Sequence, residues 1–254
     1  MFIDQTRDIL LAVTACSNWR EIASSIVQQK PPTTVLLKNG PHIRSSQNPL
    51  PLVREIFFEN VYTPKELSIG ANDVVVDIGA NVGVFSLYAA SRTKNHVYSF
   101  EPLPSNYEFL QRNAAANHFE HITAFCTAVS DSIGMVKLYM SDSVAGNLLF
   151  DHNINGKLEK YIEVPTTTLP AIMDDNKLTQ IDFLKLDCEG SEGAILTSTP
   201  LEYLRRIGKI AMEFHDNVSS LDHNGLQNVL RTAGFSTMFR WNGRSPFGYL
   251  YGWR

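Results

Sequence analysis

Cysteine is scarce in this chain. Its 254 residues contain three cysteines, Cys16, Cys126 and Cys188, which form neither a Cys-x-x-Cys pair nor a zinc-ligand spacing. A disulfide framework and a structural zinc site are therefore not expected. We predict that the thiols serve as small buried groups in a reducing, cytoplasmic setting.

An excess of positive charge and a long apolar run are also missing. The formal net charge is −4, which gives no electrostatic reason to expect binding to nucleic acid or to an anionic membrane surface. No stretch approaches the roughly 18 apolar residues typical of a membrane span. Asp4 and Asp8 stand where a secretory signal would be basic and then apolar, so no signal peptide is expected. These features predict a cytoplasmic protein without nucleic-acid or membrane partners, and they leave homo-oligomer formation open.

The composition that remains is that of a globular protein, with 44% hydrophobic and 19% charged residues. The length suits one large α/β domain, or one domain with a small extra lobe. We expect residues 1–70 to form a helical and hairpin cap and residues 71–254 to form the main domain. The cap either packs only against the main domain or also contacts substrate, and Tyr62 is the candidate contact residue.

Strand and helix patterns alternate through the main domain. Such alternation predicts an α/β fold with a doubly wound, mostly parallel sheet, to which a C-terminal hairpin adds antiparallel strands. The polar segment 141–157 is predicted to be a mobile loop. The expected major strands cover residues 74–78, 96–100, 121–129, 181–187 and 207–214, with further strands at 135–140 and 158–164 and the hairpin at 236–241 and 247–253.

A glycine turn follows the first major strand, where Gly79 and Gly83 are separated by three residues. A strand, a tight turn and a helix N-terminus together favour a nucleotide-like ligand. The third glycine of the dinucleotide fingerprint is absent, and Asp77 at the strand end would repel a pyrophosphate. A cationic ligand suits this carboxylate better, and S-adenosylmethionine (SAM) carries both a sulfonium and an α-ammonium group. The alternative is a core turn that binds no ligand.

Carboxylates also end the other major strands, and ligands of open α/β sheets bind beyond such ends. Glu101 follows Gly79 by 22 positions (101 − 79), where an acidic residue is placed to bind ribose hydroxyls. Its alternative role is that of a surface carboxylate near a helix start. The end of the third strand is placed to meet the adenine edge. The predicted cofactor contacts are Asp77, Gly79, Ala80, Asn81, Gly83, Glu101, Pro102, Thr127, Ala128, Val129 and Asp187.

Asp187, Glu189 and His215 are the candidate catalytic residues, because Asp187 and Glu213 end the last two major strands and the other two follow closely. Asp187 is a general base or an orienting partner for an acceptor hydroxyl, a ligand to a divalent cation such as Mg²⁺, or a cap for the next helix. Asp187 and Glu189 flank the position expected for the reactive end of the ligand. His215 is either a base or a structural residue.

These motifs together resemble the FkbM-type family of SAM-dependent methyltransferases over residues 74–216. The resemblance implies a class I methyltransferase (Rossmann-like) fold, SAM bound against residues 77–83 and 101, and usually O-methylation of sugars or secondary metabolites. The chain departs from the family at Thr168-Leu-Pro170, where members often have Thr-Leu-Asp. Macrolide-sugar methyltransferases of the TylF type are similar in outline and use a metal at an Asp-x-Asp after the same strand. That similarity implies Asp187 and Glu189 as the corresponding ligand pair. The motifs that carry the resemblance are Val-Val-Asp77-Ile-Gly-Ala-Asn-Val-Gly83, Ser99-Phe-Glu-Pro102, Ala128-Val-Ser-Asp131 and Ile181-Asp-Phe-Leu-Lys-Leu-Asp-Cys-Glu-Gly-Ser-Glu192.

The expected function is therefore that of a SAM-dependent O-methyltransferase that acts on a hydroxyl of a sugar or other small metabolite. A nitrogen or peptide acceptor is the alternative within the same chemistry. A nicotinamide-dependent oxidoreductase and a SAM-binding module without catalysis are alternatives of other classes.

Overall fold

The computed structural model describes residues 2–139, 160–216 and 218–254. Within these ranges seven strands form a central sheet in the order β11-β12-β10-β9-β3-β4-β5, and β10 to β5 are parallel. The predicted C-terminal hairpin is present: β12 pairs antiparallel with both β10 and β11, so only β12 opposes the parallel strands and β11 runs in their direction. The strands are β3 (Val75–Ile78), β4 (Val97–Phe100), β5 (Ile122–Phe125), β9 (Ile181–Leu186), β10 (Ile207–His215), β11 (Ser236–Arg240) and β12 (Phe247–Trp253).

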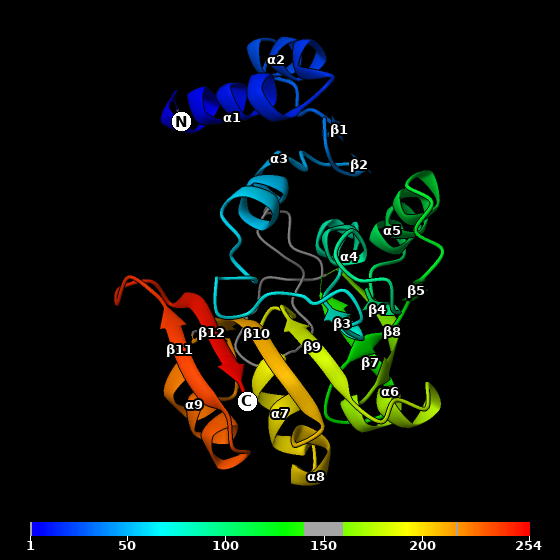
Figure 1. Cartoon of the computed structure of the whole chain (residues 1–254), viewed down its shortest axis with the longest axis vertical. Helices are drawn as coiled ribbons and strands as arrows, with labels where there is room; N and C mark the ends of the chain where they lie inside the picture. The colour runs from blue at the N-terminus through cyan, green and yellow to red at the C-terminus, as the bar shows by residue number, and fades with distance from the viewer. Residues whose placement is uncertain (1, 140–159, 217) are drawn as a thin grey trace.

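Helices cover both faces of this sheet (Figure 1). Successive strand residues point to opposite faces, so Leu184 and Leu186 join one apolar cluster while Phe183 joins another. The first cluster includes residues of α6, α7 and α9, and the second includes residues of α4. The helices of the main domain are α4 (Val84–Ala90), α5 (Pro104–Ala116), α6 (Leu169–Asp175), α7 (Glu192–Ser198), α8 (Leu201–Leu204) and α9 (His223–Thr232).

The third major strand differs from the prediction of one strand over 121–129. The chain leaves the central sheet after Phe125, and Ala128–Val129 form β6 in a separate three-stranded sheet of order β6-β8-β7. There β7 (Gly134–Tyr139) pairs antiparallel with β8 (Tyr161–Thr167). An apolar run shows that a segment is buried but not which sheet it joins. The loop predicted at 141–157 lies within 140–159, outside the described residues.

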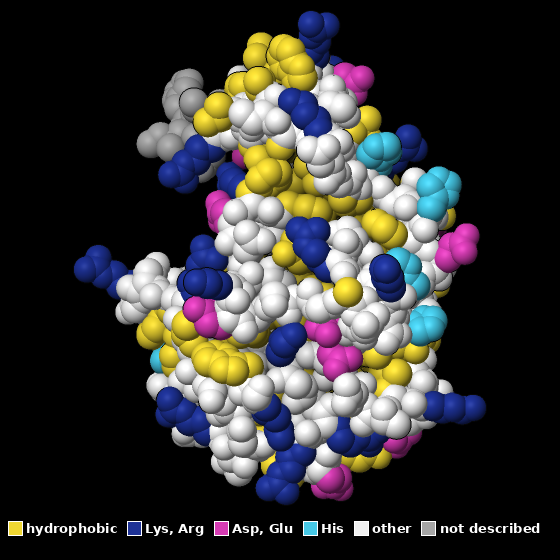
Figure 2. Space-filling view, viewed as in Figure 1, with side chains coloured by type: hydrophobic (Ala, Val, Ile, Leu, Met, Phe, Trp, Pro, Cys, Tyr) yellow, Lys and Arg dark blue, Asp and Glu magenta, His cyan; other side chains and the backbone are white. Residues whose placement is uncertain are grey.

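The N-terminal elements lie on the side of the sheet toward which β9 points (Figure 1). Their buried side chains, among them Ile22 and Ile43, share one cluster with Val75 of β3 and Phe85 of α4. Apolar side chains also gather on the outer surface of the N-terminal helices (Figure 2), where Leu10 is 63% exposed. These elements are α1 (Phe2–Ala15), α2 (Trp19–Val27), β1 (Thr34–Leu36), β2 (His42–Arg44), α3 (Leu50–Val53) and the π-helical turn η1 (Arg54–Phe58).

Two asparagines at the C-terminal end of α5 attach the N-terminal hairpin to the main domain. Asn113 accepts a hydrogen bond from the amide of Arg44 at 2.9 Å and donates to the carbonyl oxygens of Arg44 and Val82, both at 2.8 Å. Asn117, the residue after the helix, bonds the amide and the carbonyl oxygen of His42 in the same way.

Among the helices that the structure describes, none has the length and hydrophobicity that a membrane span requires.

Candidate active site

The glycine turn after β3 packs directly against the end of β9. Gly79 has φ of +77°, and a Cβ at this position would lie 1.7 Å from the backbone oxygen of Asp187. Only glycine tolerates both the backbone conformation and the close approach. Gly83, with φ of +89°, then starts α4. The turn therefore packs the backbone of Gly79 against the backbone of Asp187.

Asp77 lies beneath this turn and is fully buried. Its Oδ1 is 3.2 Å from the ammonium of Lys185, and its Oδ2 accepts a hydrogen bond from Ser86 at 2.6 Å. Lys185 also donates to the carbonyl oxygen of Gly79 at 2.7 Å. Burial lowers the pKa of Lys185, but the charges of Asp77 and Asp187 raise it above its ordinary value overall. Lys185 thus balances the carboxylate that we expected to face a cationic ligand.

The sequence patterns did not single out Lys185, although a usable signal was present. It is the lysine near the end of an otherwise apolar stretch, Phe183-Leu-Lys-Leu186, of a buried strand. An ammonium group is rarely fully buried without a partner, so a lysine at this position indicates a buried carboxylate nearby. The structure shows that partner, because β3 pairs with β9 so that Lys185 lies opposite Asp77.

Glu101 lies at the end of β4 and holds the turn from the other side. Its Oε2 accepts a hydrogen bond from the amide of Asn81 at 2.8 Å, and its Oε1 accepts one from the amide of Leu103 at 2.9 Å. Burial raises the pKa of Glu101 to about 7, against the opposing effect of these two amides. Asn81 itself is exposed and has φ of +51°.

The predicted cofactor contacts of the first two strand ends therefore lie together. Since Asp77 pairs with Ser99 and Ile78 with Phe100, the next residue of each strand, Gly79 and Glu101, are neighbours as well. The amides of Gly79 and Ala80 both donate to the carbonyl oxygen of Phe100, and the amide of Asn81 donates to Glu101. Contacts of Gly83 and Pro102 with the cofactor stay predictions.

The predicted adenine contacts differ from expectation. Ala128 and Val129 are each 1% exposed and pair with β8, so their side chains pack inside the protein. This burial argues against contact between these two side chains and a ligand, while contact of their backbone with the adenine edge stays a prediction. Thr127 lies between β5 and β6 and is partly exposed, so its contact with adenine stays a prediction.

Asp187 is held at one carboxylate oxygen. Its Oδ2 accepts a hydrogen bond from the hydroxyl of Tyr62 at 2.8 Å and lies 3.6 Å from the ammonium of Lys185. In the described structure, neither a hydrogen bond nor an ion pair involves Oδ1. Among the described residues, no hydrogen bond joins the Asp187 side chain to the first turn of α7, so the structure does not support its predicted role as a helix cap. The carboxylate is fixed at Oδ2 and has an unengaged oxygen.

The other candidate residues surround Asp187. Met212 of β10 pairs with Leu186 of β9, which brings Glu213 beside Asp187. His215 lies with its Nε2 3.4 Å from Oε2 of Glu189. Burial raises the pKa of Glu189 to about 7 and that of Glu213 to about 8, and the nearby charge of Asp187 adds to both shifts.

His215 has carboxylates at both ring nitrogens, since its Nδ1 lies 3.5 Å from Oε1 of Glu192. Burial lowers the pKa of His215, but Glu192, Asp187 and Glu189 outweigh that effect and raise it to about 10. An imidazolium cannot accept a proton at neutral pH. The prediction of His215 as a general base is therefore not supported, and the structural alternative fits better.

Glu192 is a second residue to which the sequence patterns gave no role. It is fully buried, and its two oxygens accept hydrogen bonds from the amides of Cys188 and Gly190, each at 3.0 Å. Between these amides Glu189 adopts φ of +53°. Glu192 thus fixes the loop that presents Glu189 to His215.

Among the residues that the structure describes, Asp187, Glu213 and His215 form one group of metal-ligating types, with ligand atoms within 4.8 Å of one another. The two carboxylates suit Mg²⁺. His215 does not suit it, because both of its nitrogens face carboxylates and favour the protonated ring, which has no lone pair to donate. The expected companion ligand, Glu189, faces His215 instead.

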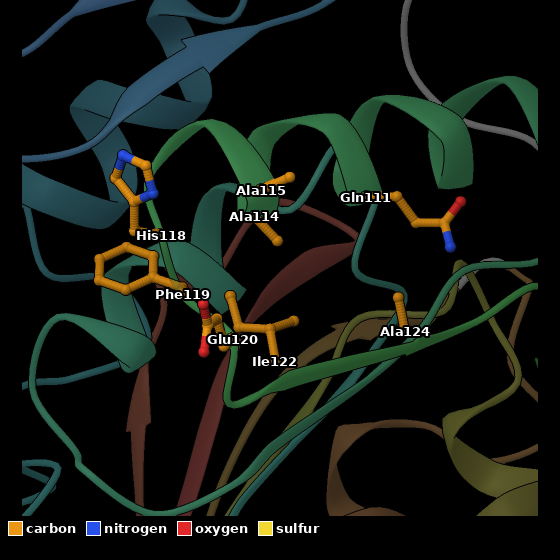
Figure 3. Close-up of a pocket in the computed structure, with 8 residues that line it drawn as sticks. All are labelled: Gln111, Ala114, Ala115, His118, Phe119, Glu120, Ile122 and Ala124. Atoms are coloured by element: carbon orange, nitrogen blue, oxygen red, sulfur yellow. The ribbon is translucent and has the colours of Figure 1, made fainter.

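A separate groove lies between α5 and β5 (Figure 3). Gln111, His118, Phe119, Ile122 and Ala124 are among the residues that line it, and its volume is about 380 Å³. None of the predicted site residues lines this groove, so it is distinct from the carboxylate cluster.

Comparison with known proteins finds relatives of this chain. The sequence profile of the FkbM methyltransferase domain matches residues 77–236, more than half of the chain. The chain is 27% identical over 236 residues to the 31-O-demethyl-FK506 methyltransferase FkbM of Streptomyces tacrolimicus, and the match covers 81% of this chain and 89% of that protein. It is also 26% identical over 226 residues to the AMB antimetabolite synthetase AmbE of Pseudomonas aeruginosa; this match covers 74% of this chain but spans only 10% of AmbE.

A solved structure shows the same fold. The methyltransferase FkbM from Methylobacillus flagellatus superposes with a TM-score of 0.51 at 17% sequence identity, over 92% of this chain and 60% of that one. The order of the central strands is therefore that of a class I methyltransferase fold.

Proposed function

Because the chain belongs to the FkbM methyltransferase family, we propose that it transfers the methyl group of SAM to a hydroxyl group of a sugar or other small metabolite. Methyl transfer with SAM as the donor follows from the family. The nicotinamide-dependent oxidoreductase considered from the sequence does not agree with it. The hydroxyl acceptor is our proposal. It rests on Oδ1 of Asp187, which has no hydrogen-bond partner in the described structure and lies next to the glycine turn.

The site has a residue suited to each end of SAM: Glu101 lies where the ribose is expected, and Asp187 lies where the methyl group is expected. Bound there, SAM supplies an electrophilic methyl group. Glu101 would accept hydrogen bonds from the ribose hydroxyls through the lone pairs that Asn81 and Leu103 leave free. The exposed turn at Asn81 lies beside it.

Asp187 then acts on the acceptor. As the acceptor oxygen forms its bond to the methyl carbon, the carbon–sulfur bond breaks and its electron pair stays on sulfur. The hydroxyl proton passes to Oδ1 of Asp187, so the products are a methyl ether and S-adenosylhomocysteine. Much of the acceleration comes from alignment of the reacting atoms, and proton removal adds to it.

The relatives support a metabolite hydroxyl as the acceptor. The name of the Streptomyces tacrolimicus protein describes an O-methyltransferase that acts on 31-O-demethyl-FK506. A nitrogen or peptide acceptor is the alternative outcome of the experiment below.

The proposal is tested first by binding and turnover. Calorimetry is expected to show that SAM and S-adenosylhomocysteine bind, and the absence of binding at millimolar ligand would refute the proposed function. A panel of monosaccharides, O-demethylated macrolides, amines and peptides is then incubated with methyl-labelled SAM. Label recovered as a methyl ether supports the proposal, whereas label on nitrogen supports the alternative.

Asp187→Asn tests the role of the carboxylate. We expect kcat to fall about a hundredfold or more, because a positioned general base contributes roughly 10²–10⁴, while the Kd for SAM changes little. The matched control is Asp175→Asn, which alters an exposed residue at the end of α6 and should leave both values unchanged. If Asp187→Asn turns over normally, Asp187 is not the base.

A divalent cation bound by Asp187 stays a prediction with a simple test. Asp187 and Glu213 are the residues that would hold it, and it would lower the pKa of the acceptor hydroxyl. Loss of turnover on chelation, restored by added Mg²⁺, would support the cation. Unchanged turnover would leave proton transfer to Asp187 alone.

A further inference from the structure

The segment 59–63 follows η1, and three side chains of the main domain secure it. The carbonyl oxygen of Val61 accepts a hydrogen bond from the hydroxyl of Tyr251 at 2.5 Å. The hydroxyls of Thr63 and Tyr88 are 2.9 Å apart, and Arg240 donates to the carbonyl oxygen of Glu59 at 3.1 Å. These bonds come from β12, α4 and β11, so the segment is fastened to three elements.

Tyr62 is the side chain that this segment directs into the site. It is 5% exposed, and its ring meets the rings of Phe85 and Tyr249 edge-on, at centroid distances of 5.6 and 5.5 Å. The ammonium of Lys185 lies 5.2 Å from the centroid of the Tyr62 ring. Packing on these sides fixes the direction of the hydroxyl, which lies 2.8 Å from Asp187 Oδ2 and 3.5 Å from Glu213 Oε2.

The hydroxyl of Tyr62 is a hydrogen-bond donor throughout the working pH range. Burial raises its pKa well above the ordinary value for tyrosine, and the charges of Asp187 and Glu213 add to the shift. A carboxylate accepts such a bond only at a lone pair, which sets the orientation of its plane.

We propose that Tyr62 is a positioning residue of the active site, which holds Asp187 by Oδ2 so that Oδ1 receives the proton of the acceptor hydroxyl. Lys185 alone cannot set this orientation: its ammonium lies 3.6 Å from Asp187, and Asp77 and the carbonyl oxygen of Gly79 hold it more closely. The N-terminal region thereby contributes a side chain to the chemistry of the main domain. This inference rests on the proposed function of Asp187 as the base.

The first test compares Tyr62→Phe with Tyr88→Phe. Each change removes one hydroxyl from a tyrosine that is 5% exposed, and Tyr88 binds the same segment without touching Asp187. With the acceptor that the panel identifies, we expect Tyr62→Phe to lower kcat by about tenfold or more, since a hydrogen bond to a charged group is lost. The KM for that acceptor and the Kd for SAM should stay within about twofold.

Tyr88→Phe should leave kcat within about twofold even if it lowers Tm. Equal losses of kcat in the two variants would mean that Tyr62 acts only by packing, and an unchanged kcat in Tyr62→Phe would also overturn the inference. Neither result would bear on the proposed function, which fails if wild-type protein does not bind SAM, does not transfer its methyl group, or transfers it to nitrogen instead of a hydroxyl.

The contact itself is tested without any acceptor. Thermal unfolding of Tyr62→Phe, Asp187→Ala and the double variant forms a double-mutant cycle. A shared hydrogen bond predicts that the double variant loses clearly less Tm than the sum of the single losses. Additive losses would overturn the inference, whether or not the panel yields an acceptor.

Discussion

Glu101 shows how one side chain combines a structural with a binding role. Its two oxygens hold the amides of Asn81 and Leu103, so the carboxylate shapes the turn before any ligand arrives. Only 6% of the residue is exposed, and this burial favours the protonated form. Ribose hydroxyls are best accepted by the ionised form, so stability and binding have opposite requirements at this residue.

Glu101 therefore predicts a pH dependence of SAM binding. The pKa of Glu101 is raised to about 7, so the ionised fraction rises about tenfold between pH 6 and pH 8. We expect the Kd for SAM, measured by calorimetry, to be several-fold higher at pH 6 than at pH 8. In Glu101→Gln, binding should be weaker and should lose most of this dependence, and a wild-type Kd that is constant over this range would contradict the assignment.

The raised pKa of Glu101 affects the stability of the fold in the opposite direction to SAM binding: stability falls as the pH rises. Because the pKa of Glu101 in the folded protein exceeds its ordinary value of 4.5, the folded state binds more protons between these two values. The stability that this group contributes is complete below about pH 4.5 and is lost as the pH rises through about 7. Tm of the ligand-free protein should fall less steeply over this range in Glu101→Gln than in the wild type.

At the scale of elements, the loop between β9 and α7 is built around a buried acid. Glu192 begins α7, yet its carboxylate turns back to the amides of Cys188 and Gly190. The bonds fix a loop in which Glu189 has a positive φ, a conformation that costs free energy outside glycine. The loop that follows β9 therefore depends on a buried acid in the first turn of the next helix.

Glu192→Gln tests this dependence. A glutamine can accept only one of the two amide bonds, and its own N–H group would face the other donor. We expect the free energy of unfolding to fall by about 1–3 kcal/mol, measured by denaturant unfolding, together with a reduced kcat. The control Glu202→Gln changes an exposed residue of α8. If Glu192→Gln matched this control in both measurements, the loop would not depend on Glu192.

At the scale of the whole molecule, the N-terminal region and the main domain share a core. One apolar cluster runs from Ile22 and Ile43 to Val75 and Tyr251, and Asn113 joins β2 to α5. We propose, as the sequence predicts, that residues 1–70 form a cap on the domain of residues 71–254 and not an independently folding unit.

This arrangement predicts a single unfolding transition. Asn113→Ala removes three hydrogen bonds from a residue that is 1% exposed, so we expect a loss of about 3 kcal/mol. Calorimetry should show one transition at lower temperature, while Gln111→Ala, on the exposed side of the same helix, should change it little. An early separate transition in Asn113→Ala would show that the N-terminal region folds independently.

The sequence by itself determined the parallel sheet, the glycine turn and the carboxylates at the strand ends. These features are local: apolar runs define buried strands, and parallel strands bring their carboxyl ends to one edge. Gly79, Glu101, Asp187 and Glu213 could therefore be grouped from the strand pattern alone, and the motifs around them were sufficient to suggest the family to which the chain belongs.

Only the tertiary structure decided which partner each of these groups has. Tyr62 reaches Asp187 across 125 positions of sequence, Lys185 meets Asp77 through the pairing of β3 with β9, and residues 122–129 divide between two sheets. No local pattern contains these contacts, because packing between distant segments sets them. The sequence therefore grouped the candidate site residues, while the fold decided that Asp187 is held at Oδ2 and that carboxylates surround His215.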